Sequence, residues 1–103
     1  MMDEKHKILD IAMNLNRIGN WAADDFLGKK PRILLFMKQT SDYLNHLSPK
    51  NYPPALKNTL TLFLNEFRLM SNEVEQLPDQ LLWAEKMMTW GNILTHRAQL
   101  LKP

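Results

Sequence analysis

The sequence predicts an all-α fold: an up-down-up-down antiparallel four-helix bundle that forms one domain over residues 1–103. Apolar residues recur at three- and four-residue spacing through four successive segments, which is the period of amphipathic helices. Glycine is scarce, at 3 residues in 103, and the six prolines lie at the borders of the segments. Four helices joined by short links are typical of bundles in which sequence neighbours run antiparallel.

The first helix is predicted at about residues 3–27 and the second at about 31–47. Gly28 is expected to end the first as a C′ residue, and Pro31 to open the second at a position where its missing N–H costs nothing. Gly19 inside the first helix predicts close packing against a neighbouring helix. The apolar seam of the first helix consists of Ile8, Ile11, Leu15, Ile18, Ala22 and Phe26.

The third helix is predicted at about residues 54–75 and the fourth at about 78–101, beginning at Pro78. The third has the most regular seam, and Leu60, Phe63 and Phe67 are expected among the most buried residues. The fourth has two apolar stripes, one of which contains Trp83 and Trp90. Trp83 is expected at the level of residues 19–21 on the first helix, as a large side chain over a glycine.

Several classes of chemistry have no sequence signature here. The chain has no cysteine, which excludes disulfides and thiolate metal sites, and no apolar run of 18 residues, which excludes a membrane span. The first residues lack the apolar region of a secretory signal, so the cytoplasm is the expected compartment. Glu-x-x-His pairs, a glycine-rich phosphate loop and a nucleophile elbow are all missing. We therefore expect no enzyme, no cofactor and no metal.

Basic residues are predicted to gather at one end of the bundle, where both termini and the second connector meet. The net charge is +2, and clustered cations can bind phosphates without reading sequence. The candidate nucleic-acid-binding residues are Lys5, Lys7, Lys50 and Arg97 at this end, with Lys29, Lys30 and Arg32 at the other end. The alternative is that these charges only complement helix dipoles and keep the surface solvated.

The tryptophans predict self-association. A helix in a monomeric bundle needs roughly one apolar stripe, but the fourth helix has two, and Trp21 lies outside the seam of the first. The candidate interface consists of Trp21 and Trp90, with Asn14 and Arg17 in its polar rim. Closed cyclic symmetry is the usual arrangement of identical chains. The alternative is that all three indoles pack into the core of a monomer.

Two short stretches carry a family resemblance: the turn Lys29-Lys30-Pro31-Arg32 and the run Trp90-Gly91-Asn92-Ile93-Leu94. With its four predicted helices, the chain resembles the bundle proteins encoded within ribosomal RNA intervening sequences. It is similar, through them, to the accessory variability determinant proteins of diversity-generating retroelements. The chain is shorter than those proteins, and residues 14–25 carry no motif of theirs.

The resemblance implies a non-enzymatic cyclic homo-oligomer. Its basic surfaces would bind RNA or DNA, and a partner protein such as a reverse transcriptase. The competing expectation is a protein–protein interaction or adaptor module with no nucleic-acid role. No membrane association is expected in either case.

Overall fold

The computed structural model describes residues 3–77 and 79–102, and within them the fold is all-α with no strand. The helices are α1 (Glu4–Asn45), α2 (Pro54–Glu73) and α3 (Gln80–Ala98), with a short 3-10 helix, η1 (Pro49–Asn51), before α2. The predicted start of the last helix at Pro78 lies outside the described residues. Asp79 is the N-cap of α3, where its carboxylate accepts a hydrogen bond from the Leu82 N–H at 3.0 Å.

The chain has three assigned helices rather than the four predicted, because α1 contains both of the first two. The helix is interrupted only at Asp25, which has non-helical dihedral angles of φ −157° and ψ 83°. The Asp25 carboxylate accepts a hydrogen bond from the Gly28 N–H at 3.0 Å and so acts as an N-cap for the turn that follows. The predicted C′ role of Gly28 and the helix start at Pro31 are therefore wrong. One aspartate ends one helical segment and begins the next without a loop.

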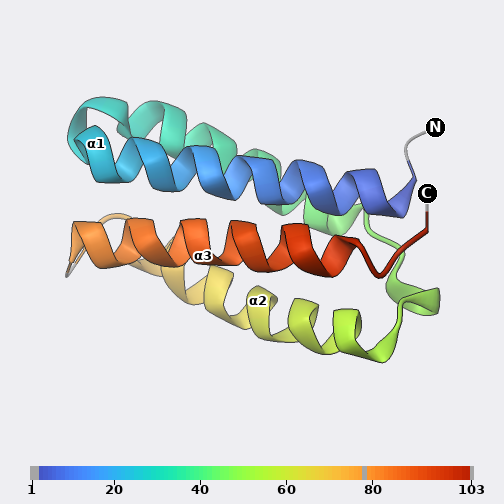
Figure 1. Ribbon diagram of the computed structural model, residues 1–103. Coiled ribbons are helices and arrows are strands. Elements are labelled where there is room, and N and C mark those ends of the chain that lie inside the picture. The colour runs from blue at the N-terminus through green and yellow to red at the C-terminus, as the bar shows by residue number, and fades with distance from the viewer. Residues whose placement is uncertain (1–2, 78, 103) are drawn as a thin grey trace.

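The bend at Asp25 folds α1 back on itself, into a first arm (residues 4–24) and a second arm (residues 26–45). Figure 1 shows the second arm running behind the first in the opposite direction. Asn14 Nδ2 donates to Gln39 Oε1 at 3.0 Å, and Lys7 Nζ donates to the His46 carbonyl at 3.2 Å. These two bonds each join an early residue to a late one and fix the antiparallel register of the arms.

Helix α3 lies along the first arm, and this contact is the most extensive one between elements. A β-carbon on Gly19 would lie 2.4 Å from Met88 Cγ and 2.9 Å from the Ala84 carbonyl oxygen. The close packing predicted at Gly19 is thus confirmed. The residues over Gly19 are Ala84 and Met88, however, and not Trp83. Gly91 marks a second close approach between α3 and the first arm, because a β-carbon on Gly91 would lie 2.8 Å from the side chain of Asn16.

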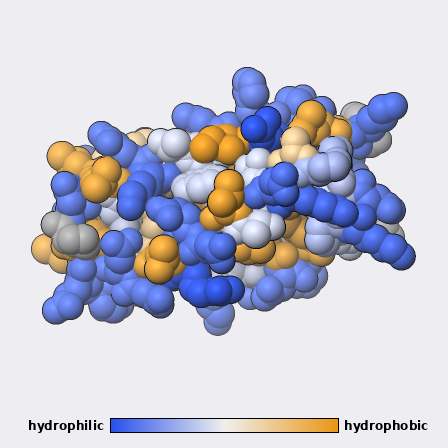
Figure 2. All heavy atoms as spheres, turned by 90° about the horizontal axis from the view of Figure 1, so that it is seen from below, coloured by the Kyte–Doolittle hydropathy of each residue, from blue (hydrophilic) through white to orange (hydrophobic). Residues whose placement is uncertain are grey.

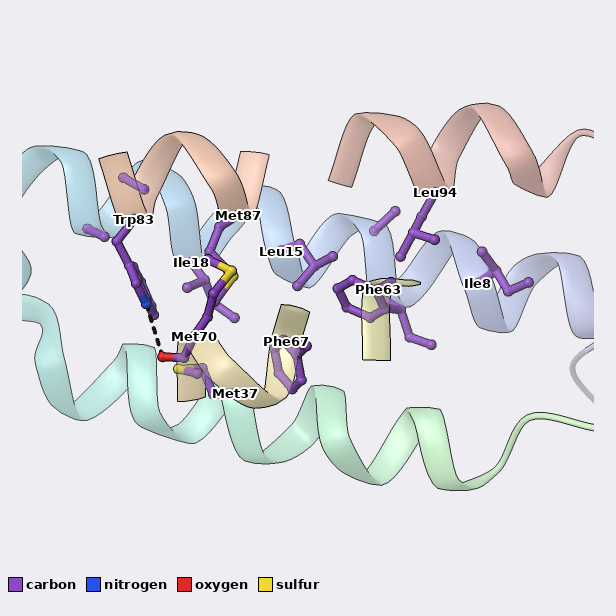
Figure 3. Packing of buried hydrophobic residues seen from close by; sticks show 14 of the residues in the cluster. Ile8, Leu15, Ile18, Met37, Phe63, Phe67, Met70, Trp83, Met87 and Leu94 are labelled. Carbon is purple, nitrogen blue, oxygen red and sulfur yellow. Dashed lines mark hydrogen bonds between the residues drawn. The ribbon is translucent and has the colours of Figure 1, made fainter. Parts of the chain in front are cut away.

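Trp83 is buried in the core between α3 and α2 (Figure 3). Its indole Nε1 donates to the Met70 carbonyl at 3.0 Å, and its ring meets that of Phe26 edge-on at 5.8 Å. The third-helix seam is confirmed, since Leu60, Phe63 and Phe67 are all buried, with Phe63 only 1% exposed.

Helix α2 runs antiparallel to α3 but stands apart from the second arm of α1. Glu66 pairs with Lys86 at 3.5 Å, and Arg97 Nε donates to Thr59 Oγ1 at 3.0 Å, so the α2–α3 contact extends along both helices. Close backbone approaches between α1 and α2 are few in comparison. In Figure 1, the beginning of α2 diverges from the rest of the fold at the end where both chain ends lie. This end we call the terminal end.

Candidate functional site: an apolar groove between α1 and α2

A groove lies between the last turns of the second arm and the first half of α2. Its cavity has a volume of about 440 Å³ and lies between Leu44 on the arm and Leu64 on α2. It is lined by Leu44, Leu47, Pro49, Lys50, Lys57, Leu60, Thr61 and Leu64. Leu44 and Leu47 are half-buried, and Leu64 is 43% exposed. This groove is therefore an apolar surface that the chain does not cover itself.

A second hollow of about 290 Å³ continues the groove along α2 toward the bend. It shares Leu44 and Leu64 with the first, so the two hollows adjoin at these residues and follow one another along α2; together we call them the channel. Its lining consists of Ser41, Leu44, Asn45, Leu64, Phe67, Arg68, Ser71 and Asn72. The floor is apolar and the sides are mainly polar, which is the composition of a surface that binds an amphipathic ligand.

The sequence leaves the groove open because the last turns of the second arm, beyond Thr40, carry no buried residue. Thr40 is the last buried residue of the arm, and none is buried from 41 to 51. The chain then crosses to α2 through η1 and the paired prolines Pro53 and Pro54, which favour extended geometry and hold α2 away from the arm. Leu60 and Phe63 of α2 face the core, while Leu64 is left on the groove side.

The charge around the groove has one sign. Lys50 and Lys57 lie at the terminal end of the lining and Arg68 toward the bend, and the lining contains no carboxylate. Among residues 3–77 and 79–102, none of these three cations takes part in an ion pair. The groove therefore combines an apolar floor with unneutralised positive charge.

The predicted nucleic-acid-binding residues do not form one site. Lys29, Lys30 and Arg32 lie near the bend, whereas Lys5, Lys7, Lys50 and Arg97 lie toward the terminal end. Several are neutralised within the chain: Lys7 pairs with Glu4 at 2.7 Å, Lys30 with Glu75 at 2.8 Å, and Lys29 with Asp24. The Arg32 guanidinium stacks 5.2 Å from the centre of the Trp21 ring. Only Lys50 of this set lines the groove.

Glu4 ties the terminal end together. Its Oε1 accepts hydrogen bonds from the Tyr52 hydroxyl at 2.5 Å and the Ser48 N–H at 2.6 Å, while Oε2 meets Lys7. Desolvation raises the pKa of the Glu4 carboxyl, but the bonds from Lys7, Tyr52 and Ser48 together outweigh it and leave the pKa below its usual value. Burial, and then the bond to Glu4, raise the pKa of Tyr52. This cluster fixes the connector that forms one end of the groove.

The residues predicted for a self-association interface lie in different environments. Asn14 is only 3% exposed and bonds to Gln39 between the arms, so its predicted place in a surface rim is wrong: the fold-back of α1 covers it. Arg17 is exposed. Trp21 is half-buried against Phe36 of the second arm, and Trp90 is half-buried against Phe63 of α2, on the opposite seam of the fold.

The groove itself was not among the sites predicted from the sequence. The one residue that could have indicated the groove in the sequence was Leu64. It belongs to a second apolar row on the predicted third helix and falls outside the regular seam. Other leucines of α2 and α3 are also exposed, and Figure 2 shows the apolar side chains of one face in separate patches among polar ones. What distinguishes Leu64 is that it lines a concavity, whereas Leu62, at 63% exposed, does not.

The fold and the groove together define a small all-α protein with a helix-lined apolar channel edged by cations. Within residues 3–77 and 79–102, no group of three or more His, Asp or Glu side chains is placed to hold a metal ion. In the same part of the chain, no helix is both long and apolar enough to cross a bilayer. No protein-family model, curated protein or solved structure matches this chain.

Proposed function

We propose that the protein is a non-enzymatic accessory module that binds another protein through the groove between the second arm and α2. In this proposal the two arms of α1 count as two helices, and the domain acts as an antiparallel four-helix bundle with one seam left open. Three seams are closed by close packing, hydrogen bonds, aromatic contacts or an ion pair, and the fourth is open along the channel. A rigid scaffold with one unfilled seam is suited to receive an element from a partner.

The observation that carries the proposal is the exposed apolar floor of the groove. Leaving Leu44, Leu47 and Leu64 partly uncovered costs the isolated chain apolar burial worth about 25 cal/mol per Å². Contiguous apolar surface with a polar rim is typical of protein interaction sites. The polar groups along the channel are hydroxyls, amides and cations, and they include no acid–base pair that would suggest catalysis.

A photo-crosslinking amino acid at Thr61 tests this proposal in the cells that produce the protein. Thr61 lines the groove, and Leu62 beside it points away from the groove and serves as the matched control position. We expect a discrete protein adduct from position 61 and none of that mass from position 62. The adduct should disappear when Leu64→Asp is added. An adduct that forms equally from both positions would contradict the proposal.

Nucleic-acid binding is the second candidate, and it is supported by the cations of the terminal end. Lys5, Lys50 and Lys57 have no ion-pair partner among the described residues, and the resemblance to accessory determinants of retroelements implies such a role. Phosphate contacts of this kind give a steep salt dependence and little sequence preference. Titration with RNA and duplex DNA at low and moderate salt tests it. No binding at low salt would eliminate this candidate and leave the protein-binding proposal intact.

A further inference from the structure

We infer that the occupant of the groove is an acidic amphipathic α-helix of roughly 14 residues, contributed by a partner protein. This inference rests on the proposed function and adds the chemistry of the partner. It follows from the length of the channel, the nature of its walls and the sign of its charge.

The length of the channel sets the length of the ligand. The lining residues on α2 run from Lys57 to Asn72. At a rise of 1.5 Å per residue this interval is about 22 Å. A helix of roughly 14 residues, or four turns, spans the same distance.

The walls favour a helix over an extended strand. One wall is α2, and the other is the end of α1 followed by the connector and η1. Neither wall contains a strand, and backbone N–H and C=O groups within the helices are already bonded there. An extended segment would find no sheet edge here to satisfy its own backbone groups, whereas a helix satisfies them internally. Leu44, Leu60 and Leu64 then offer side-chain contacts to apolar residues repeating at three- and four-residue spacing on the ligand.

The positive charge of the rim favours a ligand helix with acidic residues on either side of its apolar stripe. Lys50 and Lys57 lie near one end of the channel, Arg68 lies near the other, and no carboxylate lines it. Glu or Asp residues on either side of the apolar stripe would meet these cations, while Lys or Arg would be repelled. The cations therefore supply specificity for an acidic helix and a faster rate of association.

Two other occupants fit less well. A second copy docked groove to groove would face Lys57 and Arg68 with the same cations, which is unfavourable. RNA or single-stranded DNA needs aromatic faces for base stacking, and the only aromatic residue in the lining is Phe67, which is 5% exposed. A second copy remains an outcome of the experiment below, and nucleic acid is tested by the titration with RNA and duplex DNA described above.

The test uses two fluorescein-labelled peptides of about 16 residues, each with leucines at positions 3, 7, 10 and 14. One carries Glu at the positions flanking the leucines and the other carries Lys. Binding to the full chain is measured by fluorescence anisotropy at low and moderate salt. We expect the Glu peptide to bind at least about tenfold more tightly than the Lys peptide at low salt, and the difference to shrink as salt screens the charges.

Matched variants assign the binding to the groove. Leu64→Asp should weaken binding of the Glu peptide by about tenfold or more, whereas Leu62→Asp on the other side of α2 should not. The double charge reversal Lys57→Glu and Arg68→Glu should invert the preference between the peptides. Arg17 is an exposed cation on the first arm, outside the groove. Arg17→Glu therefore serves as the control for a charge reversal elsewhere on the surface, and it should leave the preference between the peptides unchanged. Thermal melts confirm that each variant is folded.

The outcomes separate this inference from the proposed function. Equal binding of the two peptides, lost in Leu64→Asp, would overturn the acidic preference and leave a protein-binding groove. A groove-specific protein adduct from Thr61, with neither peptide binding, would likewise overturn only the inference. A multimer by light scattering that Leu64→Asp dissociates would make a second copy the occupant. If no groove-specific adduct forms at Thr61 and neither peptide binds, both the proposed function and this inference are overturned.

Discussion

Gly19 of the first arm and Met88 of α3 approach so closely that a β-carbon on Gly19 would lie 2.4 Å from Met88 Cγ. The side chain of Met88 is flexible and can move aside, but the Ala84 carbonyl oxygen, at 2.9 Å, is backbone and cannot. The glycine therefore sets how near the first arm and α3 can come. That spacing in turn positions both helices against the core residues of α2.

The first prediction concerns this contact. Alanine has a better helix propensity than glycine by about 1 kcal/mol, whereas overpacking costs about 1–3 kcal/mol. Because backbone resists the added methyl group, the packing cost should outweigh the propensity gain, and Gly19→Ala should lower the free energy of unfolding by up to about 2 kcal/mol. Gly91→Ala meets the Asn16 side chain, which can turn toward solvent, and should be close to neutral. Urea denaturation of the two variants checks this, and a greater loss in Gly91→Ala would contradict it.

The second prediction concerns the cap at the bend. A β-carbon on Gly28 would lie 2.0 Å from Asp25 Oδ2, so Gly28→Ala must displace the capping carboxylate. Loss of an N-cap costs about 1 kcal/mol. Gly28→Ala should therefore destabilise the wild type, yet stabilise an Asp25→Ala background by up to about 1 kcal/mol through helix propensity. A double-mutant cycle of unfolding free energies measures the coupling. Additive effects would show that the cap does not depend on Gly28.

The third prediction concerns the core of α2. Phe63 is 1% exposed and packs against the rings of Phe67 and Trp90, with centroids 5.4 Å away in both cases. Phe63→Ala should cost about 3–5 kcal/mol, enough to threaten the folding of a domain this small. Leu62→Ala, at an exposed position one residue before it, should change stability by no more than about 0.5 kcal/mol. A melting temperature for Phe63→Ala within a degree or two of wild type would refute the assignment.

The fourth prediction is a pH dependence at Glu4. Its pKa lies below the ordinary value of 4.5 because bonds from Lys7, Tyr52 and Ser48 outweigh the effect of desolvation. A group with a depressed folded-state pKa contributes stability that is complete above the unfolded-state pKa and is lost as the pH falls through the folded-state pKa. The free energy of unfolding of wild type should exceed that of Glu4→Gln by about 1 kcal/mol at pH 7. The difference should shrink as the pH falls below the ordinary pKa of 4.5 and vanish only below the depressed folded-state pKa. Thermal melts at several pH values measure it, and a constant difference would argue against this role.

The fifth prediction is self-association through the half-buried tryptophans. Light scattering at tens of micromolar decides between a multimer and a mass near 12.1 kDa. If the protein is a multimer held by the predicted interface, Trp21→Ala or Trp90→Ala should dissociate it without loss of helical signal. Because Trp21 and Trp90 lie on opposite seams, the two changes should act on different contacts. A mass that neither variant alters would place the interface elsewhere.

Much of the fold could be predicted from periodicity alone. The spacing of Leu60, Phe63 and Phe67 places them on one face of a helix, wherever that helix lies in the fold. Their burial therefore follows from the sequence. Gly19 likewise has few uses inside a helix other than a close approach. By contrast, the identity of the residue over it, Met88 and not Trp83, depends on the rotation of α3 about its axis, which periodicity does not encode.

The candidate groove depended on the tertiary structure. Leu64 looks in the sequence like any other leucine beside a seam, and it becomes part of a channel only because the fold leaves a hollow between α2 and the second arm. Similarly, the pairing of Lys30 with Glu75 joins residues far apart in the chain. Which side chains meet across the fold cannot be predicted from the sequence of either segment alone.

The helical class, the buried face of each segment and a close helix–helix contact at Gly19 thus all follow from the order of the residues in the chain. The tertiary structure alone decided that Asp25 joins two helices into one bent α1, that Asn14 is covered, and that one seam stays open. The physical reason is one of range. Helix formation and amphipathicity depend on residues three and four apart, whereas bends, crossings and grooves depend on which faces meet after the chain has folded back.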